Sequence, residues 1–256
     1  MTDFGINVLT APLGKTYLFS VGQAGYIIKS KSGQLLAIDI YLSECVERLE
    51  GHVGFKRLLP KILSPFDIAF DCVIATHPHW DHYDVDSIPE LMSNNKTQLY
   101  ASVDCEELVK SESITNQNID YVKPGDHKEC GDFSIDFINC DHGSGAPDAV
   151  GVIVTVDGKR ILEVGDSCLR LDRTQEYLSV GSIDVMIAPI NGAYGNLNEQ
   201  DCVDLCKALN PRITVPCHYG MFASHGGNPG KFFDIITEQC PDKNFVIMAM
   251  GEKIEL

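Results

Sequence analysis

The sequence predicts an α+β protein in which strands and helices recur in both halves of the chain. Residues 6–40 contain short apolar runs separated by glycines, and such runs are typical of strands. From residue 149 onward, apolar runs of strand length alternate with segments of helical periodicity. The chain has 256 residues, of which 44% are hydrophobic, so it can bury a large core. We therefore expect a single domain over residues 1–256.

The first half of the chain supplies strands of the first sheet and the beginning of a second. We expect strands at residues 6–10, 16–20, 25–29, 35–39, 70–75, 98–102, 121–122 and 133–138, the last two in the second sheet. Helical spacing predicts helices at residues 43–49, 84–92 and 104–110. The basic run at residues 55–61 lacks regular alternation. We interpret it as a solvated connector, with a lid near the site mouth as the alternative.

The second half begins with a hairpin and then alternates between strands and helices. Residues 150–156 and 160–164 flank the turn Asp157-Gly158, which is a typical hairpin sequence. A buried strand is expected at residues 183–189, and Asn198 is placed to cap a helix that ends before Pro211. The remaining elements are a strand at 213–216, a helix at 230–239, and strands at 244–250 and 253–256.

The stretch from Ala75 to Asp84 carries the strongest chemical signal. It holds four candidate metal ligands within six residues, namely His77, His79, Asp81 and His82. They follow the apolar run at 70–75, so they lie on a turn where several side chains can converge. Imidazole nitrogens and carboxylate oxygens suit zinc, manganese and iron. Four ligands so close together would crowd one ion, which favours two adjacent ions. The alternative is a histidine-rich surface turn that binds no metal.

This pattern, His-x-His-x-Asp-His after a buried strand, resembles that of the metallo-β-lactamase superfamily. That family completes its site with a later His, an Asp and a last His, each near a strand end. The chain has these residues in this order at His142, Asp166 and His218. The match extends over nearly the whole chain.

The resemblance implies the ligand set, the cofactors and the architecture. Two divalent ions, Mn²⁺ or Zn²⁺, would be bound: one by His77, His79 and His142, the other by Asp81, His82 and His218, with Asp166 bridging them. In the superfamily an Asp at the end of an early strand supports the metal loop, and Asp39 occupies that place. The implied fold is a four-layer αββα sandwich with the site at one edge.

These residues predict a metal-dependent hydrolase that uses a metal-bound hydroxide on an ester-like bond. Asp81 is expected to orient the nucleophile or carry its proton, and Asp166 to stay ionised between two cations. Within the superfamily, residues 189–198 and 213–222 resemble the L-ascorbate-6-phosphate lactonases, which implies a phosphorylated sugar lactone as substrate and a lactonase-like carboxylic ester hydrolase. We expect substrate contacts from Asn191, Tyr194, His225 and Lys231.

Other activities remain open on this evidence. A small-molecule phosphodiesterase is the first alternative, because two metals also suit in-line displacement. Another ester or thioester hydrolase of the same superfamily and a metal-binding sensor without turnover are further alternatives.

Charge and cysteine content restrict the partners and the compartment. The net charge of −16 argues against nucleic acid and anionic membranes, but not against a small anionic substrate near metal ions. The sequence leaves a homo-oligomer open. Ten scattered cysteines without a Cys-x-x-Cys pair, a first segment without signal-peptide character, and no long apolar run favour the cytoplasm.

Overall fold

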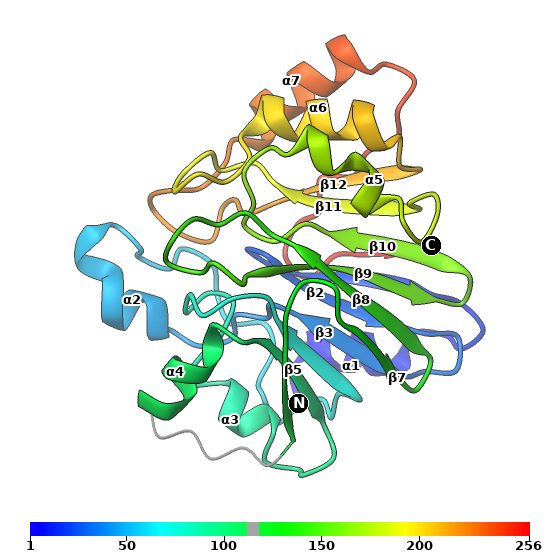
Figure 1. Cartoon of the computed structure of the whole chain (residues 1–256). Coiled ribbons are helices and arrows are strands. Elements are labelled where there is room, and N and C mark those ends of the chain that lie inside the picture. Colours follow the sequence, from blue (N-terminus) through cyan, green and yellow to red (C-terminus); the bar gives the residue numbers. More distant parts are fainter. Residues whose placement is uncertain (112–117) are drawn as a thin grey trace.

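Two β-sheets form the centre of the molecule, which is a computed structural model that describes residues 1–111 and 118–256 (Figure 1). Within these residues, the first sheet has the order β13 (Lys253–Glu255), β1 (Tyr17–Gly22), β2 (Gly25–Lys29), β3 (Leu35–Ile38), β4 (Cys72–Ala75), β5 (Gln98–Ser102) and β6 (Ile119–Val122). The order of the second is β12 (Ile213–Cys217), β11 (Val185–Pro189), β10 (Lys159–Glu163), β9 (Val150–Val156), β8 (Phe133–Asn139) and β7 (His127–Cys130).

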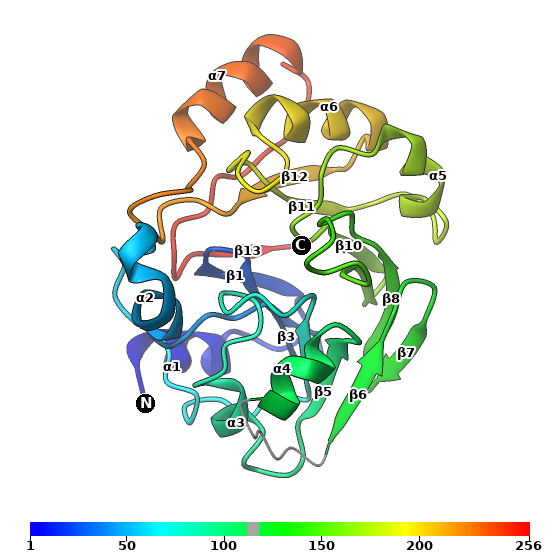
Figure 2. The same ribbon diagram turned by 60° about the vertical axis from the view of Figure 1, so that its left-hand side comes forward.

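Helices cover the outer face of each sheet. The first sheet is covered by α1 (Asp3–Thr10), α2 (Cys45–Glu50), α3 (Ile88–Leu91) and α4 (Cys105–Ser111), and the second by α5 (Thr174–Tyr177), α6 (Glu199–Leu209) and α7 (Pro229–Gln239). Short 3₁₀ turns at Gly51–Val53 and Leu171–Arg173 adjoin α2 and α5. Figure 2 shows the two groups of helices on opposite sides of the sheets. The structure therefore has the four layers, αββα, that the resemblance implied.

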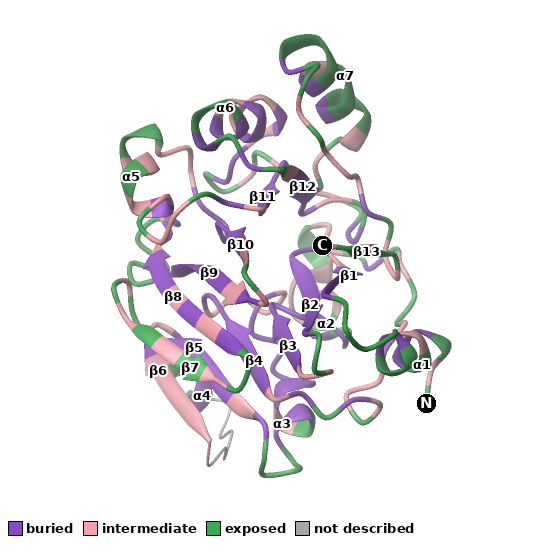
Figure 3. Cartoon of the chain, turned by 90° about the vertical axis from the view of Figure 1, so that its right-hand side faces the viewer, coloured by how far each residue is buried: buried purple, intermediate pink, exposed green. Residues whose placement is uncertain are grey.

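The alternation of side chains along the strands explains these layers. In β2, Ile28 packs between the sheets and Ile27 packs against the helices of the first layer. In β11, Ile187 faces the other sheet and Met186 faces the helices of the fourth layer. Successive strand residues point to opposite faces, so a strand that is apolar at every position is buried on both. Figure 3 shows this burial along the central strands.

Most predicted elements are present, but four differ from the structure. Residues 6–10 belong to helix α1, because the Thr2 side chain accepts a hydrogen bond from Gly5 N at 3.1 Å and caps it. The strand at 119–122 pairs parallel with β5 and so joins the first sheet instead of the second. Residues 244–250 form only one isolated bridge, between Phe245 and Thr214.

The fourth difference lies directly after the candidate ligands, where helix α3 is shorter than expected. The Asp84 carboxylate accepts hydrogen bonds from the backbone N–H groups of Leu42, Ser43, Asp86 and Ser87. It thereby ties the ligand loop to the segment after β3. The chain turns here and becomes helical only from Ile88.

One edge of the sandwich collects the ends of strands that run in the same direction. Strands β3 and β4 are parallel in the first sheet, and β10, β11 and β12 are parallel in the second. The backbone N–H of Val150 donates a hydrogen bond to Thr76 O at 3.0 Å, and this bond joins the two sheets at this edge. The loops after these strands therefore meet, and they carry the candidate site.

Candidate metal centre

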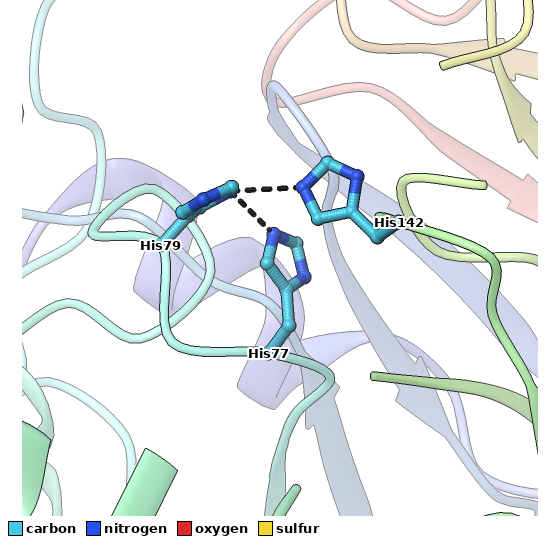
Figure 4. Close-up of side chains that lie close together, drawn as sticks. All are labelled: His77, His79 and His142. Atoms are coloured by element: carbon cyan, nitrogen blue, oxygen red, sulfur yellow. Dashed lines mark hydrogen bonds between the residues drawn. The ribbon is translucent and has the colours of Figure 1, made fainter. Parts of the chain in front are cut away.

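Three histidines from two sheets point their ring nitrogens at one place. His77 and His79 follow β4, and His142 follows β8. His79 Nδ1 lies 3.0 Å from His77 Nε2 and 3.0 Å from His142 Nε2, as the dashed lines in Figure 4 show. These three nitrogens could hold one metal ion. The predicted group of His77, His79 and His142 is thus brought together by the fold.

A chain of hydrogen bonds sets which nitrogen of His77 is available. The Asp39 carboxylate has no proton to donate, so it accepts from Thr76 N at 2.8 Å and from Thr76 Oγ1 at 2.6 Å. The Thr76 hydroxyl then accepts from His77 Nδ1 at 3.0 Å. A neutral His77 therefore carries its proton on Nδ1 and presents a lone pair at Nε2. That is the form of histidine that binds metals.

The protonation of this group favours a cation. Burial lowers the pKa of His77 well below its usual range, and it also lowers the pKa of His79 and of His142. All three rings are therefore neutral near neutral pH, and each neutral ring has one nitrogen with a free lone pair. His142 Nδ1 is buried and has no hydrogen-bond partner among the described residues. The donor set fits a divalent transition-metal ion.

A second group lies beside the first and mixes carboxylates with imidazoles. Asp166 Oδ2 is 3.1 Å from His218 Nε2 and 3.4 Å from His82 Nε2. Asp81 Oδ2 is 3.5 Å from His218 Nε2 and 3.6 Å from His82 Nε2. Asp81, His82 and His218 could hold one ion, and Asp166 also lies in a group with His77 and His82. The seven residues predicted as ligands therefore gather in one place.

The charges in this second group are strongly coupled. Burial disfavours the charged form of His82, but Asp166, Asp81 and Asp39 outweigh it and raise the pKa of His82 well above its usual range. Burial also disfavours the charged form of His218, but the negative charge of Asp166 outweighs it and raises the pKa of His218. Burial acts against ionised Asp166 as well, yet His218 and His82 hold its pKa well below the usual range. A bound cation would offset the negative charge of these carboxylates, as the protons of the imidazolium rings do.

Gln23 is part of this arrangement and was not predicted from the sequence. Its Nε2 donates to Asp81 Oδ2 at 2.9 Å and lies 3.0 Å from His218 Nδ1. Gln23 stands in the turn between β1 and β2, with a φ of 56° next to Gly22 with a φ of 90°. The sequence around Gln23 indicates only a turn. It does not indicate a contact with His218, which lies 195 positions further along the chain.

A cavity of about 460 Å³ opens over the two groups, and His79, Asp81, His142, Asp166 and His218 form part of its wall. Its volume lies within the range of small-molecule sites. The rest of the wall is mainly apolar and comes from several loops and from helices α2 and α4. The cavity gives a small molecule access to the candidate ligands.

The segment at residues 43–65 supplies one side of this cavity through Val46, Val53 and Phe55. Our interpretation of its basic run as a solvated connector holds for Lys56 and Lys61, which are exposed, but not for Arg57. Arg57 is only 8% exposed, and its guanidinium donates to Ser43 O at 2.8 Å and, through Nε, to Leu59 O at 2.8 Å. The charged group is used to fix the backbone of the segment, because these carbonyls have no strand partner there.

The predicted substrate contacts fall into two sets. Asn191, Tyr194 and His225 line the cavity. Lys231 does not, because its Nζ donates to Glu199 Oε2 at 2.8 Å on the outer helical layer. Its place in the first turn of α7, after the Asn228 cap, points it at α6. Asn196 also lines the cavity and was missed, since a lone Asn in a loop gives no sequence signal.

Among the described residues, no helix is both long and apolar enough to cross a bilayer.

Sequence comparison places the chain among known proteins. A family model described as beta-lactamase superfamily domain matches residues 5–218. A UPF0173 metal-dependent hydrolase from Anaeromyxobacter dehalogenans is 27% identical over 233 residues, which cover 86% of this chain and 80% of that protein. A second UPF0173 metal-dependent hydrolase, from Enterococcus faecalis, is 26% identical over 188 residues, which cover 68% of this chain and 79% of that protein.

Solved structures show the same fold. Igni18, a metallo hydrolase from Ignicoccus hospitalis, superposes with a TM-score of 0.72 at 21% identity, covering 94% of this chain and 98% of that one. The metallo-β-lactamase fold protein YhfI from Bacillus subtilis gives a TM-score of 0.70 at 15% identity, covering 95% and 100%. These likenesses confirm the metallo-β-lactamase fold predicted from the sequence.

Proposed function

The chain belongs to the beta-lactamase superfamily, and from this premise we propose that it is a metal-dependent hydrolase that cleaves an ester-like bond in a small molecule. One observation carries the proposal. Ring nitrogens of the neutral His77, His79 and His142 converge beside the Asp166 carboxylate, at a cavity that a small molecule can enter. The curated relatives described as metal-dependent hydrolases support the same reaction class.

We propose that the seven gathered residues hold two divalent ions, with manganese and zinc as the candidates. When bound, such ions polarise the bond under attack and lower the pKa of a water molecule toward neutrality. The remaining tasks belong to the side chains. Asp166 stays ionised, because His218 and His82 hold its pKa low, and its negative charge would offset the positive charge of bound cations.

Asp81 is the residue we propose for positioning the attacking water and accepting its proton. Its side chain is 15% exposed and lines the cavity, whereas His82 beside it is fully buried. Gln23 Nε2 donates to Asp81 Oδ2 and fixes the orientation of the carboxylate. Because Asp81 lines the cavity, a water molecule there can reach its carboxylate.

We propose a lactone or a related carboxylic ester as the bond that is cleaved. A ring of this kind fits a cavity of about 460 Å³. The phosphate group of a phosphorylated sugar lactone finds less support, because within the described part of the chain no lysine or arginine lines the cavity. An unphosphorylated substrate is therefore the better match to the wall.

A hydrolysis assay with paired substrates tests this function. The protein should open a neutral lactone after incubation with Mn²⁺ or Zn²⁺, and a chelator should abolish the activity. Bis-p-nitrophenyl phosphate in parallel tests the phosphodiesterase alternative. Cleavage of the phosphodiester without lactone opening would show that the enzyme is a phosphodiesterase and not a lactonase. Metal binding without any hydrolysis would favour a metal-binding sensor.

A further inference from the structure

Part of the cavity wall is built from aromatic rings that stack on one another. The Phe55 and His225 ring centroids are 4.9 Å apart with an interplanar angle of 18°, and the Tyr194 ring lies 5.1 Å from His225. Tyr194 Oη and His225 Nε2 are 3.2 Å apart, so the two exposed rings are also linked by a hydrogen bond. We call Phe55, Tyr194 and His225 the ring wall.

Apolar side chains continue this surface around the cavity. Trp80 comes from the ligand loop, Leu108 from α4, and Val46 and Val53 from the segment around α2. Val53 is 47% exposed and Tyr194 is 64% exposed, although both lie at the mouth of a site. Exposed apolar groups that gather around a cavity indicate a ligand that covers them.

Two carboxamides, those of Asn191 and Asn196, also belong to the cavity wall. Asn196 is only 5% exposed, and neither its Nδ2 nor its Oδ1 has a hydrogen-bond partner among the described residues. The same holds for both side-chain atoms of Asn191. Buried amides are normally paired, because an unpaired polar group keeps the cost of its lost hydration. These two amides therefore point to hydrogen bonds that a ligand supplies.

The loop that carries the amides is held in place by its own backbone. Gly192 N donates to Leu197 O at 3.0 Å, and Leu197 N donates to Ser167 O at 2.9 Å, next to Asp166. Gly192 has a φ of 62°, and a Cβ there would come within 2.9 Å of Asn198 Cβ. The loop is thus fixed against the candidate ligands, so the amides keep a set distance from the reacting bond.

The charges of the wall restrict the ligand further. Within the described residues, the ionisable acids on the wall are Glu50, Asp81 and Asp166, and no lysine or arginine accompanies them. Positive charge from bound ions would lie only at the floor of the cavity. An anionic group at the outer end would face Glu50 without a cation, whereas an uncharged group meets no such penalty.

We infer that the substrate is an uncharged lactone or ester that carries an aromatic or branched apolar group. The apolar group lies on the ring wall, the scissile carbonyl lies at the candidate ligands, and a neutral polar group beside it pairs with Asn191 and Asn196. This inference rests on the proposed function, since it names the substrate class of the same site.

Binding can be measured without turnover, because Trp80 is the single tryptophan of the chain and lines the cavity. The probe is phenylcyclohexanone, a neutral ketone that has the shape of a phenyl-substituted lactone and cannot be hydrolysed. Titration should change the Trp80 fluorescence saturably in the metal-loaded protein. Glucose phosphate, the anionic probe, should bind more weakly.

Three phenylalanine variants separate the contribution of the ring wall from general surface effects. Phe55→Ala should weaken ketone binding about two- to tenfold, the range expected for the loss of one aromatic contact. Phe55→Leu, which keeps an apolar side chain, should weaken it less. Phe66→Ala is the control, because Phe66 is 70% exposed and lies outside the cavity wall, and its affinity should equal that of the wild type.

Three results would overturn the inference: tighter binding of glucose phosphate, equal affinities in the Phe55 and Phe66 variants, or opening of a sugar-phosphate lactone while a phenyl-substituted lactone is left intact. The last result would leave the hydrolase proposal standing. Ketone binding at the ring wall without hydrolysis of any ester or lactone would do the opposite: it would support the ligand class and contradict the proposed function.

Discussion

Asp39 and His82 form a fully buried pair in which His82 Nδ1 donates to Asp39 Oδ2 at 2.7 Å. Asp39 directly follows β3 and has a φ of 46°, a backbone conformation that Asp adopts more readily than most residues. The pair leaves His82 Nε2 directed toward Asp81 and Asp166. Because Asp39 also binds Thr76, which binds His77, one carboxylate orients a histidine in each of the two groups.

Asp39→Asn should therefore weaken metal binding while the fold persists. The amide nitrogen of Asn would face either the Thr76 backbone N–H, in the place of Oδ1, or both the Thr76 hydroxyl and His82 Nδ1, in the place of Oδ2. In either case a donor that positions the candidate ligands loses its acceptor. We expect a loss of about 10- to 100-fold in metal affinity, measured by competition with a chromophoric chelator. Asp71→Asn is the matched control, because Asp71 Oδ2 accepts from Leu35 N at 2.8 Å at the other end of β3. Equal affinities in the two variants would contradict the role of Asp39.

Asn196→Leu should raise stability and lower activity. Leu has a similar size and removes a buried amide whose two polar atoms are unpaired among the described residues. We expect the free energy of unfolding of the ligand-free protein to rise by about 1–3 kcal/mol, measured by urea denaturation. The same variant should lose kcat/KM on a neutral lactone. A destabilised variant would show that the amide has a partner in the protein and is not kept for a ligand.

Arg57→Met should loosen one side of the cavity without removing the metal. Met keeps much of the side-chain length, but the backbone carbonyls of Ser43 and Leu59 lose their donors. The guanidinium also lies 4.8 Å from the centre of the Tyr41 ring, a contact that Met cannot replace by charge. We expect faster amide hydrogen exchange in residues 43–60 and a higher KM, with metal content unchanged.

Arg212→Met serves as the control for this variant. Arg212 pairs with Asp184 at 3.1 Å, but its side chain is 68% exposed, so the pair contributes little. Exchange rates in residues 43–60 should match those of the wild type. If Arg57→Met also left these rates unchanged, the segment would be held by its apolar contacts alone.

Acid should weaken the attachment of helix α1 to Asp67, whose carboxylate accepts a hydrogen bond from Thr2 N. Burial acts against its ionised form, but the N–H groups of Thr2 and Ser64 and the N-terminal ammonium lower the pKa of Asp67 to about 2. In the unfolded chain the pKa is about 3.9, so this contribution to stability is present above about pH 4 and is lost as the pH falls toward about 2. Asp67→Asn should lower the Tm at neutral pH, and its difference from the wild type should vanish near pH 2. A constant difference would show that the charge of Asp67 is not involved.

Local sequence was enough to predict most of the candidate ligands. His77, His79, Asp81 and His82 lie on one short loop, whereas His142, Asp166 and His218 were expected from the resemblance to the metallo-β-lactamase superfamily. The structure brings all seven together. Local sequence also gave most of the strands, because each is apolar and bounded by turn residues.

The sequence could not reveal features that depend on contacts between distant segments. The hydrogen bond of Gln23 to Asp81 spans 58 positions, and the burial of Asn196 follows from packing around its loop. The assignment of residues 121–122 to the wrong sheet has the same origin, since local sequence does not show that this strand pairs with β5. Lys231 was misplaced because its ion pair with Glu199 joins two helices of the outer layer.

The most direct test of the central claim is elemental analysis of the purified protein, the wild type beside His79→Ala and His127→Ala. His79 Nδ1 stands between two other candidate ligands, whereas His127 is paired with Asp136 and Glu129 on the surface. We predict about two manganese or zinc ions per chain in the wild type and in His127→Ala, and a clear loss in His79→Ala. Equal metal content in all three proteins, or none in the wild type after incubation with either metal, would contradict the account.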